Sequence, residues 1–267
     1  MTVDGGTMGQ EVRTAIVTGA SGGVGRATAV ALGAIGWNVA IGARRADALA
    51  DTADLVEKAG GAPFAAPLDI ADPQSVDDFF AAVTERFGPP DALVNNASLA
   101  NIGRFHEQSP ADFARDVQTN LLGTMFCARA MIRSLMPGDT IGDILFVSSE
   151  SAHAPWPELV GYGTTKAGIE GLARGLTQEL EGTGIRIGIL RIGATLTDFG
   201  STWPEGKLAS VMEQWPYFGI QRHFGYMLPE DIAATIVHVL TLPPNVQIPQ
   251  LDLRPVAPAG SGPWSKP

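Results

Sequence analysis

Short apolar runs alternate with longer helical patterns along most of this chain, and that order most constrains its fold. Strands that alternate with helices of about ten or more residues form a parallel sheet with helices on both faces. The predicted strands are residues 15–18, 38–42, 63–67, 92–95, 144–148, 185–190 and 247–253. The predicted helices are residues 24–35, 46–58, 73–87, 110–136, 163–180 and 229–242. The sequence therefore predicts an α/β fold with a doubly wound parallel sheet of about seven strands.

The first predicted strand runs directly into a glycine-rich turn, which opens the next helix. Gly19, Gly23 and Gly25 lie in the run Thr-Gly-Ala-Ser-Gly-Gly-Val-Gly. Such a turn lets backbone N–H groups approach a pyrophosphate, while the helix presents its positive N-terminus. The strand–turn–helix order favours a dinucleotide site over a turn without a ligand. Ser21 and Val24, within the same turn, are predicted to belong to that site.

The end of the second predicted strand indicates which dinucleotide binds. NAD sites carry an acidic residue about 20 residues past the glycines, whereas an arginine accommodates the 2′-phosphate of NADP. This strand ends in Ala43, Arg44 and Arg45. Either guanidinium can form charge-assisted hydrogen bonds with a phosphate, so NADP(H) is favoured over NAD. The alternative is a solvated basic pair at the start of a helix.

A tyrosine and a lysine one helical turn apart form a second candidate site. Tyr162 and Lys166 are four residues apart, and Ser149 precedes the tyrosine by 13 positions, at a strand tip. An ammonium beside a phenol favours the phenolate and lowers a pKa that is ordinarily about 10. A tyrosine tuned in this way can exchange a proton with an alcohol oxygen near neutral pH. For the pair alone, an exposed Tyr and Lys on a helix is the alternative.

Composition narrows the partners and the location. The net charge of −10 argues against nucleic acid and anionic membranes as partners. Cys127 is the only cysteine and lies in an apolar stretch, so we expect a buried thiol, no internal disulfide and a cytoplasmic protein. The opening residues show no signal segment, and no apolar run is long enough to span a bilayer. The histidines lack metal-ligand spacing, so no metal is predicted: His106, His153, His223 and His238.

The chain is predicted to form one domain over residues 13–255. Residues 1–12 are predicted to be a disordered lead-in, and residues 256–267, rich in Pro and Gly, a loose tail. Residues 195–228, called the insert below, separate the last two predicted strands. Aromatic residues are dense there: Phe199, Trp203, Trp215, Tyr217, Phe218, Phe224 and Tyr226. Their density favours a bulky apolar substrate pocket over ordinary core packing.

These features together resemble the classical short-chain dehydrogenase/reductase family, from about residue 14 to residue 254. The turn matches T-G-x-x-x-G-x-G through Gly19, Gly23 and Gly25, and through Gly22 it also matches the extended relatives. Chain length and the other motifs favour the classical branch. The catalytic tetrad of the family is matched in order by Asn120, Ser149, Tyr162 and Lys166.

The resemblance implies a Rossmann-type fold and hydride transfer between NADP(H) and a small-molecule carbonyl or secondary alcohol, that is, chemistry on CH–OH groups. It implies Tyr162 as general acid/base, Ser149 on the same substrate oxygen, and Lys166 on Tyr162 and the nicotinamide ribose. It implies Asn120 as the anchor of a water that resupplies Lys166 with protons. Further cofactor contacts implied are Asp69, Ile70, Asn96, Ala97, Gly193, Thr195 and Thr197. Candidate substrate contacts are His153, Trp156 and Trp203; for His153 a surface position is the favoured alternative.

Some positions depart from the family's motifs. Ser98 replaces the glycine of N-N-A-G, Ile192 replaces the proline of Pro-Gly, and Leu-Asp-Leu-Arg-Pro replaces the frequent Asp-Gly-Gly ending. The ending resembles a branch of NADP-dependent reductases. Residues 113–136 and 163–180 carry more apolar residues than one buried stripe requires, and the family's helix pairing implies a homo-oligomer, a tetramer rather than a dimer. The alternative is a monomer whose large helices cover a wide sheet. The alternatives to a reductase are a non-catalytic NADP-binding sensor or scaffold, and a dehydratase or epimerase on the same fold.

Overall fold

A single parallel sheet organises the computed structural model, which describes residues 12–136, 141–154, 156–220 and 222–261. The strand order is β3-β2-β1-β4-β5-β6-β7, and every pairing is parallel. This confirms the predicted doubly wound sheet. The strands are β1 (Thr14–Thr18), β2 (Asn38–Ala43), β3 (Ala62–Pro67), β4 (Ala92–Asn95), β5 (Gly142–Ser149), β6 (Ile185–Ile192) and β7 (Gln250–Leu253).

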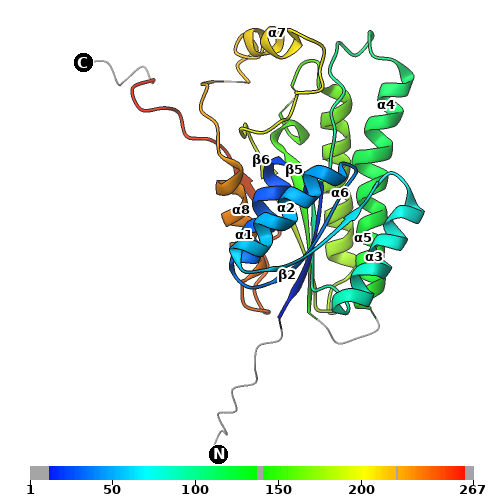
Figure 1. Ribbon diagram of the computed structural model, residues 1–267. Coiled ribbons are helices and arrows are strands. Elements are labelled where there is room, and N and C mark those ends of the chain that lie inside the picture. Colours follow the sequence, from blue (N-terminus) through cyan, green and yellow to red (C-terminus); the bar gives the residue numbers. More distant parts are fainter. Residues whose placement is uncertain (1–11, 137–140, 155, 221, 262–267) are drawn as a thin grey trace, which may run out of the picture.

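Helices cover both faces of the sheet (Figure 1). One layer holds α1 (Gly23–Ala34), α2 (Ala46–Ala59) and α8 (Pro229–Leu240); the other holds α3 (Pro73–Phe87), α4 (Pro110–Asp116), α5 (Thr124–Leu135) and α6 (Val160–Glu179). The order of the strands reverses at β1, which pairs with β2 on one side and β4 on the other. In open parallel sheets, ligands bind at the carboxyl ends of the strands beside such a reversal.

Each face of the sheet has its own apolar core. β1 is buried throughout, with Ile16 packing toward one core and Val17 toward the other. Because successive side chains of a strand point to opposite faces, a sheet covered on both faces needs near-continuous apolar strands. That requirement explains why the apolar runs of the sequence located the strands.

Three elements differ from the prediction. The expected continuous helix 110–136 is interrupted by a π-helical segment, Val117–Gly123, between α4 and α5. The insert contains an additional helix, α7 (Lys207–Gln214), and a 3-10 turn, Glu150–Ala152, follows β5. Most of the predicted lead-in and the end of the predicted tail lie outside the described residues. No helix within the described ranges is long and apolar enough to cross a membrane.

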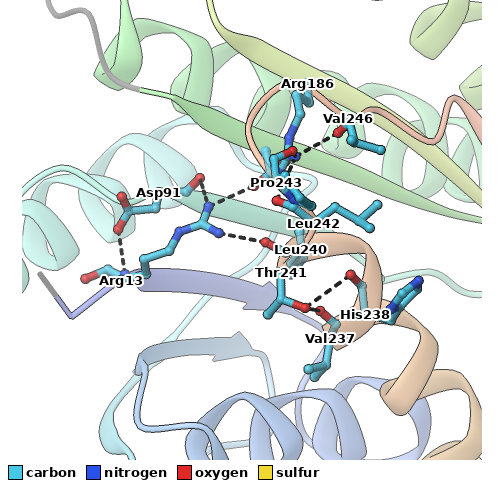
Figure 2. A network of polar contacts seen from close by, with 12 residues as sticks. Arg13, Asp91, Arg186, Val237, His238, Leu240, Thr241, Leu242, Pro243 and Val246 are labelled. Carbon is cyan, nitrogen blue, oxygen red and sulfur yellow. Dashed lines mark hydrogen bonds and ion pairs between the residues drawn. The ribbon is translucent and has the colours of Figure 1, made fainter. Parts of the chain in front are cut away.

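A buried ion-pair network closes the amino end of the sheet (Figure 2). Arg186 donates two hydrogen bonds to the Asp143 carboxylate, at 2.7 and 3.0 Å, and Arg13 donates a third at 2.8 Å. Arg186 also donates to the carbonyls of Leu242, Pro243 and Val246. The network therefore joins the starts of β5 and β6 to the loop after α8, at the opposite end of the strands from the site described next.

Candidate active site

The carboxyl ends of the strands open into a cleft of about 730 Å³. One end is lined by the glycine turn and the tips of β2 and β3, the middle by the tips of β4 and β5, and the other end by α6 and the insert. α7 lies above this end of the sheet (Figure 1). Segments from most of the chain thus meet in one elongated cleft.

The glycine turn sits at the tip of β1, where close backbone approach explains two of its glycines. Gly19 has φ of 70°, and a Cβ there would lie 2.7 Å from the Ala97 Cα. A Cβ on Gly25 would lie 2.5 Å from the Gly19 carbonyl oxygen. No side chain caps the start of α1, where Gly22 is the N-cap residue. The turn therefore presents uncapped N–H groups to the cleft, a cradle that fits a pyrophosphate.

Polar side chains hold this turn in place. Asn96 donates from its amide to the Thr18 carbonyl at 3.0 Å, and the backbone N–H groups of Asn96 and Ala97 donate to the Thr18 hydroxyl at 3.1 Å. Arg26, which the sequence analysis missed, donates to the Ser21 carbonyl at 2.9 Å and to the Thr52 hydroxyl at 3.1 Å. Asn96 and Ala97 thus lie at the predicted dinucleotide site.

Two basic side chains lie at the end of the cleft that the glycine turn and β2 line, here called the outer end. They differ in their contacts. The Arg45 guanidinium donates to the Ser21 hydroxyl at 3.0 Å, while Arg44 also lines the cleft. Asp69 and Ile70 line the same end, and the Asp69 carboxylate accepts a hydrogen bond from the Ala71 N–H at 3.0 Å. The arrangement gathers two guanidinium groups and a hydroxyl at one end of the cleft, and such groups can hydrogen-bond a phosphate.

Ser149, Tyr162 and Lys166 meet in the middle of the cleft. Ser149 ends β5, and its hydroxyl accepts hydrogen bonds from the Ser151 N–H and hydroxyl. Tyr162 and Lys166 lie on the first turns of α6, both buried, with the lysine nitrogen 5.6 Å from the centre of the tyrosine ring. The ammonium donates to the Val147 carbonyl at 2.9 Å. The predicted grouping of a serine hydroxyl, a phenol and an ammonium is therefore present.

The pKa of the phenol differs from the expectation. Burial raises the pKa of Tyr162 to about 12, hydrogen bonds with the Ser149 and Ser98 side chains offset part of the rise, and the charge of Asp116 adds to it. Burial also lowers the pKa of Lys166 to about 8. Desolvation thus outweighs the attraction that the four-residue spacing suggested. The sequence motif gave no indication that the Ser98 hydroxyl would contact the phenol.

Asn120 lies at the centre of the π-helical segment and is buried. Its amide donates to the Leu99 carbonyl at 2.8 Å and to the Thr165 hydroxyl at 3.1 Å, and its oxygen accepts from the Leu99 N–H at 2.9 Å. Asn120 therefore ties the loop that carries Ser98 to the helix that carries Tyr162. π-helical turns occur frequently at functional sites.

A second buried carboxylate, Glu170, lies one turn beyond Lys166. Arg191 donates to it at 2.9 and 2.7 Å, Ser148 donates at 2.8 Å, and Arg191 also donates to Asp252 of β7 at 2.9 Å. Burial raises the pKa of Glu170, but the hydrogen bonds from Arg191 and Ser148 outweigh it and hold the pKa below its ordinary value. This network, also missed by the sequence analysis, fixes α6 against β5, β6 and β7 directly behind the cleft.

The segment after β6 folds back over the glycine turn. Ile192 extends β6 and pairs with Ser149 and Leu253, so the residue in the family's proline position continues the strand. Gly193 donates from its N–H to the Leu253 carbonyl at 2.8 Å, and the Thr195 hydroxyl donates to the Gly193 carbonyl at 2.9 Å. The Thr197 methyl lies 3.2 Å from the position that a Cβ of Gly23 would take. All three predicted cofactor residues of this segment line the cleft.

The three candidate substrate residues lie in different environments. Trp156 and Trp203 line the cleft beside Tyr162, whereas His153 is exposed and is not part of the lining. The favoured alternative for His153, a surface position, therefore matches its placement. Within the described ranges, no group of three His, Cys, Asp or Glu side chains is placed to hold a metal ion.

The chain is similar in sequence to known oxidoreductases. The sequence model of the family "short chain dehydrogenase" matches residues 13–207. An uncharacterized oxidoreductase, YgfF of Escherichia coli, is 33% identical over 85% of this chain and 92% of its own. A 3beta-hydroxysteroid dehydrogenase of Eggerthella lenta is 32% identical over 83% of this chain and 84% of its own. The chain spans only 19% and 40% of the length of two other curated relatives.

A solved structure shares the fold. The alcohol dehydrogenase from Thermococcus sibiricus, complexed with 5-hydroxy-NADP, superposes with a TM-score of 0.79 at 33% identity, covering 92% of this chain and 97% of that one.

Proposed function

Because this chain belongs to the short-chain dehydrogenase/reductase family of oxidoreductases, we propose that it interconverts a carbonyl and a secondary alcohol with NADP(H). The observation that carries this proposal is the buried Tyr162 phenol at the cleft, flanked by the Ser149 and Ser98 hydroxyls and by Lys166. The roles of the four tetrad residues are part of the proposal, as is the organisation of residues 13–255 as one domain.

The residues of the chain manage the proton, while the bound cofactor supplies or accepts the hydride. With a pKa of about 12, Tyr162 is a protonated phenol at neutral pH, the form that donates a proton to a substrate oxygen during reduction. Ser149 orients the same oxygen through its hydroxyl. Lys166, with a pKa near 8, can exchange protons close to neutral pH and so restore the phenol. Asn120 links the loop that carries Ser98 to α6, which carries Tyr162 and Lys166, and so keeps these groups in position.

A kinetic assay tests this function. NADPH absorbance is followed while a panel of cyclic, aromatic and β-keto carbonyls is added. Turnover of any of them supports the reductase. Tight NADPH binding without turnover across the panel would favour a sensor or scaffold instead.

Arg45 is expected to decide the preference for NADP(H). Its guanidinium donates to the hydroxyl of Ser21 in the glycine turn, which supports a role in binding the 2′-phosphate. Replacement of Arg45 by Ala should weaken NADPH binding by about 10- to 100-fold, because a charge-assisted hydrogen bond contributes about 1.5–3 kcal/mol. NADH affinity should stay unchanged. Isothermal titration calorimetry measures both.

Matched variants sharpen this test. Arg44→Ala tests the neighbouring guanidinium, which also lines the cleft. Arg104→Ala is the control, because Arg104 is exposed and does not line the cleft. Arg104→Ala should bind both cofactors as the wild type does. Equal affinities of the wild-type protein for NADPH and NADH would contradict the assignment.

We also propose a homo-oligomer, a tetramer or a dimer, in the cytoplasm. Apolar side chains remain exposed along residues 117–136, a region that pairs in this family: Val117 of the π-helical segment, Met125 of α5 and Met136 directly after α5. Light scattering at micromolar concentration should return a multiple of 27.9 kDa. The mass of one chain would contradict this proposal.

A further inference from the structure

The cleft has an aromatic wall beside Tyr162. The Phe199 ring lies 5.4 Å from the Tyr162 ring, centre to centre, and the Trp203 ring lies 5.2 Å from Phe199. The Trp203 indole N–H donates to the Ala100 carbonyl at 2.9 Å, which ties the insert to the loop after β4. These rings therefore border the space next to the phenol with apolar surface.

Two more aromatic rings, Trp156 just before α6 and Trp215 of the insert, extend this apolar lining. Trp156 and Trp215 meet edge to face, 4.6 Å apart between ring centres, and both line the cleft. The Trp215 indole N–H donates to the Pro157 carbonyl at 3.1 Å, so its polar atom is used within the protein. Val211 and Trp215 of the insert pack with Leu159 and Tyr162 in a small buried cluster. The name aromatic wall is used for Trp156, Phe199, Trp203 and Trp215.

The mouth of this part of the cleft exposes further apolar side chains. Phe199 is 43% exposed, and the other exposed apolar or aromatic residues of the lining are Leu196, Leu208, Phe224 and Tyr226. All of them come from the insert. Exposed apolar side chains that line a cleft mark a place where an apolar ligand gains by burial.

The four residues of the aromatic wall are uncharged, and the charged residues of the cleft make contacts elsewhere. Among the described residues that line the cleft, six carry charged side chains: Arg44, Arg45, Asp69, Glu150, Lys166 and Asp198. The first three lie at the outer end. Asp198 lies over Gly22, Glu150 beside Gly193, and Lys166 is held at the Val147 carbonyl. The aromatic wall itself therefore offers no ion pair to a charged substrate, and the Lys166 ammonium, 5.6 Å from the centre of the Tyr162 ring, already donates to a backbone carbonyl.

We propose that the substrate is a bulky, uncharged ketone or its alcohol, whose apolar ring system packs against the aromatic wall while its oxygen meets Tyr162. This proposal rests on the proposed reductase function and adds the chemical class of the substrate. A sugar would leave most of its hydroxyls unpaired against indole and phenyl rings, and burying unpaired polar groups is unfavourable. A flat apolar ring instead gains both burial and ring stacking.

Two ketones of opposite character test the proposal: 1-decalone, which is bicyclic and apolar, and hydroxyacetone, which is small and polar. With NADPH, kcat/KM for 1-decalone should exceed that for hydroxyacetone by at least about tenfold, because even one methylene in an apolar pocket changes kcat/KM by about 10- to 200-fold. Replacement of Phe199 by Ala should lower this ratio by about tenfold. Trp203→Phe should retain most of this ratio, because phenylalanine keeps an aromatic ring on which the substrate can stack.

The matched control is Tyr217→Ala. Tyr217 is an aromatic residue of the same insert, is 87% exposed and does not line the cleft, so its removal should leave the ratio unchanged. A ratio at or below one in the wild type, or equal ratios in the Phe199 and Tyr217 variants, would overturn the proposal.

Binding separates this proposal from the proposed function. In the Tyr162→Phe variant with NADPH bound, 1-decalone should quench tryptophan fluorescence, since three indoles line the cleft, and hydroxyacetone should not. If 1-decalone binds but no ketone is reduced by the wild type, the reductase function fails and the substrate class stands. If hydroxyacetone is reduced while 1-decalone neither binds nor reacts, the function stands and the substrate class fails.

Discussion

Replacement of Tyr162 by Phe is expected to lower kcat for carbonyl reduction by at least about 100-fold while NADPH still binds. The phenol is buried in the cleft and hydrogen-bonded with Ser149, and Phe keeps its ring but lacks the O–H, so the substitution removes the proposed proton donor. General acid–base catalysis contributes about 10²–10⁴-fold. The measurement is kcat from NADPH absorbance, with NADPH affinity from calorimetry.

Tyr217→Phe is the matched control for this variant, because it removes a hydroxyl from an exposed tyrosine outside the cleft. Its kcat should equal that of the wild type. If Tyr162→Phe kept more than half of the wild-type kcat with intact NADPH binding, Tyr162 would not be the proton donor.

Replacement of Asp143 by Asn is expected to lower the free energy of unfolding by about 3–5 kcal/mol. The Asp143 side chain is 6% exposed and accepts hydrogen bonds from Arg186, 10% exposed, and from Arg13. The substitution keeps the shape of the side chain but removes the negative charge that compensates two guanidinium groups. Loss of one partner of a buried ion pair is costly because the other charge remains desolvated.

Urea denaturation measures this effect as a lower midpoint at an unchanged slope. Asp78→Asn, on the exposed face of α3, should change the free energy of unfolding by less than about 0.5 kcal/mol. Activity per folded molecule should stay near the wild-type value, because Asp143 and Arg186 lie at the starts of β5 and β6, whereas the cleft lies at the carboxyl ends of the strands. A loss below about 1 kcal/mol for Asp143→Asn would show that the network contributes little to stability.

The sequence located the sheet and much of the cleft because both depend on local patterns. A strand buried on both faces must be apolar throughout, as in β1, and a close backbone contact, as at Gly19, requires glycine. The spacing of Tyr162 and Lys166 is a property of one helix. Patterns of this kind can be recognised without knowing which elements meet in space.

Other features depend on contacts between distant segments, and the sequence did not indicate them. Glu170 and Arg191 look like ordinary surface charges until β5, β6 and α6 bring them together. Ser98 looks like a minor change of a loop until its hydroxyl is placed on Tyr162. The pKa of that phenol depends on burial, which a four-residue spacing does not report.

The π-helical segment around Asn120 makes the number of residues between α4 and α5 matter as much as their identity. A wider turn accommodates an additional residue without ending the helix, and each residue of a regular helix turns its side chain by about 100°. Before this segment, the Asp116 carboxylate lies beside Gly161 of α6. After it, Cys127 and Met131 of α5 pack into the core. A point substitution leaves the rotation of α5 relative to α4 unchanged. A deletion of one residue would change that rotation, and would turn α5 away from the core or Asn120 away from Leu99. Homologous sequences that differ in length here cannot share both contacts unless their helices are wound differently.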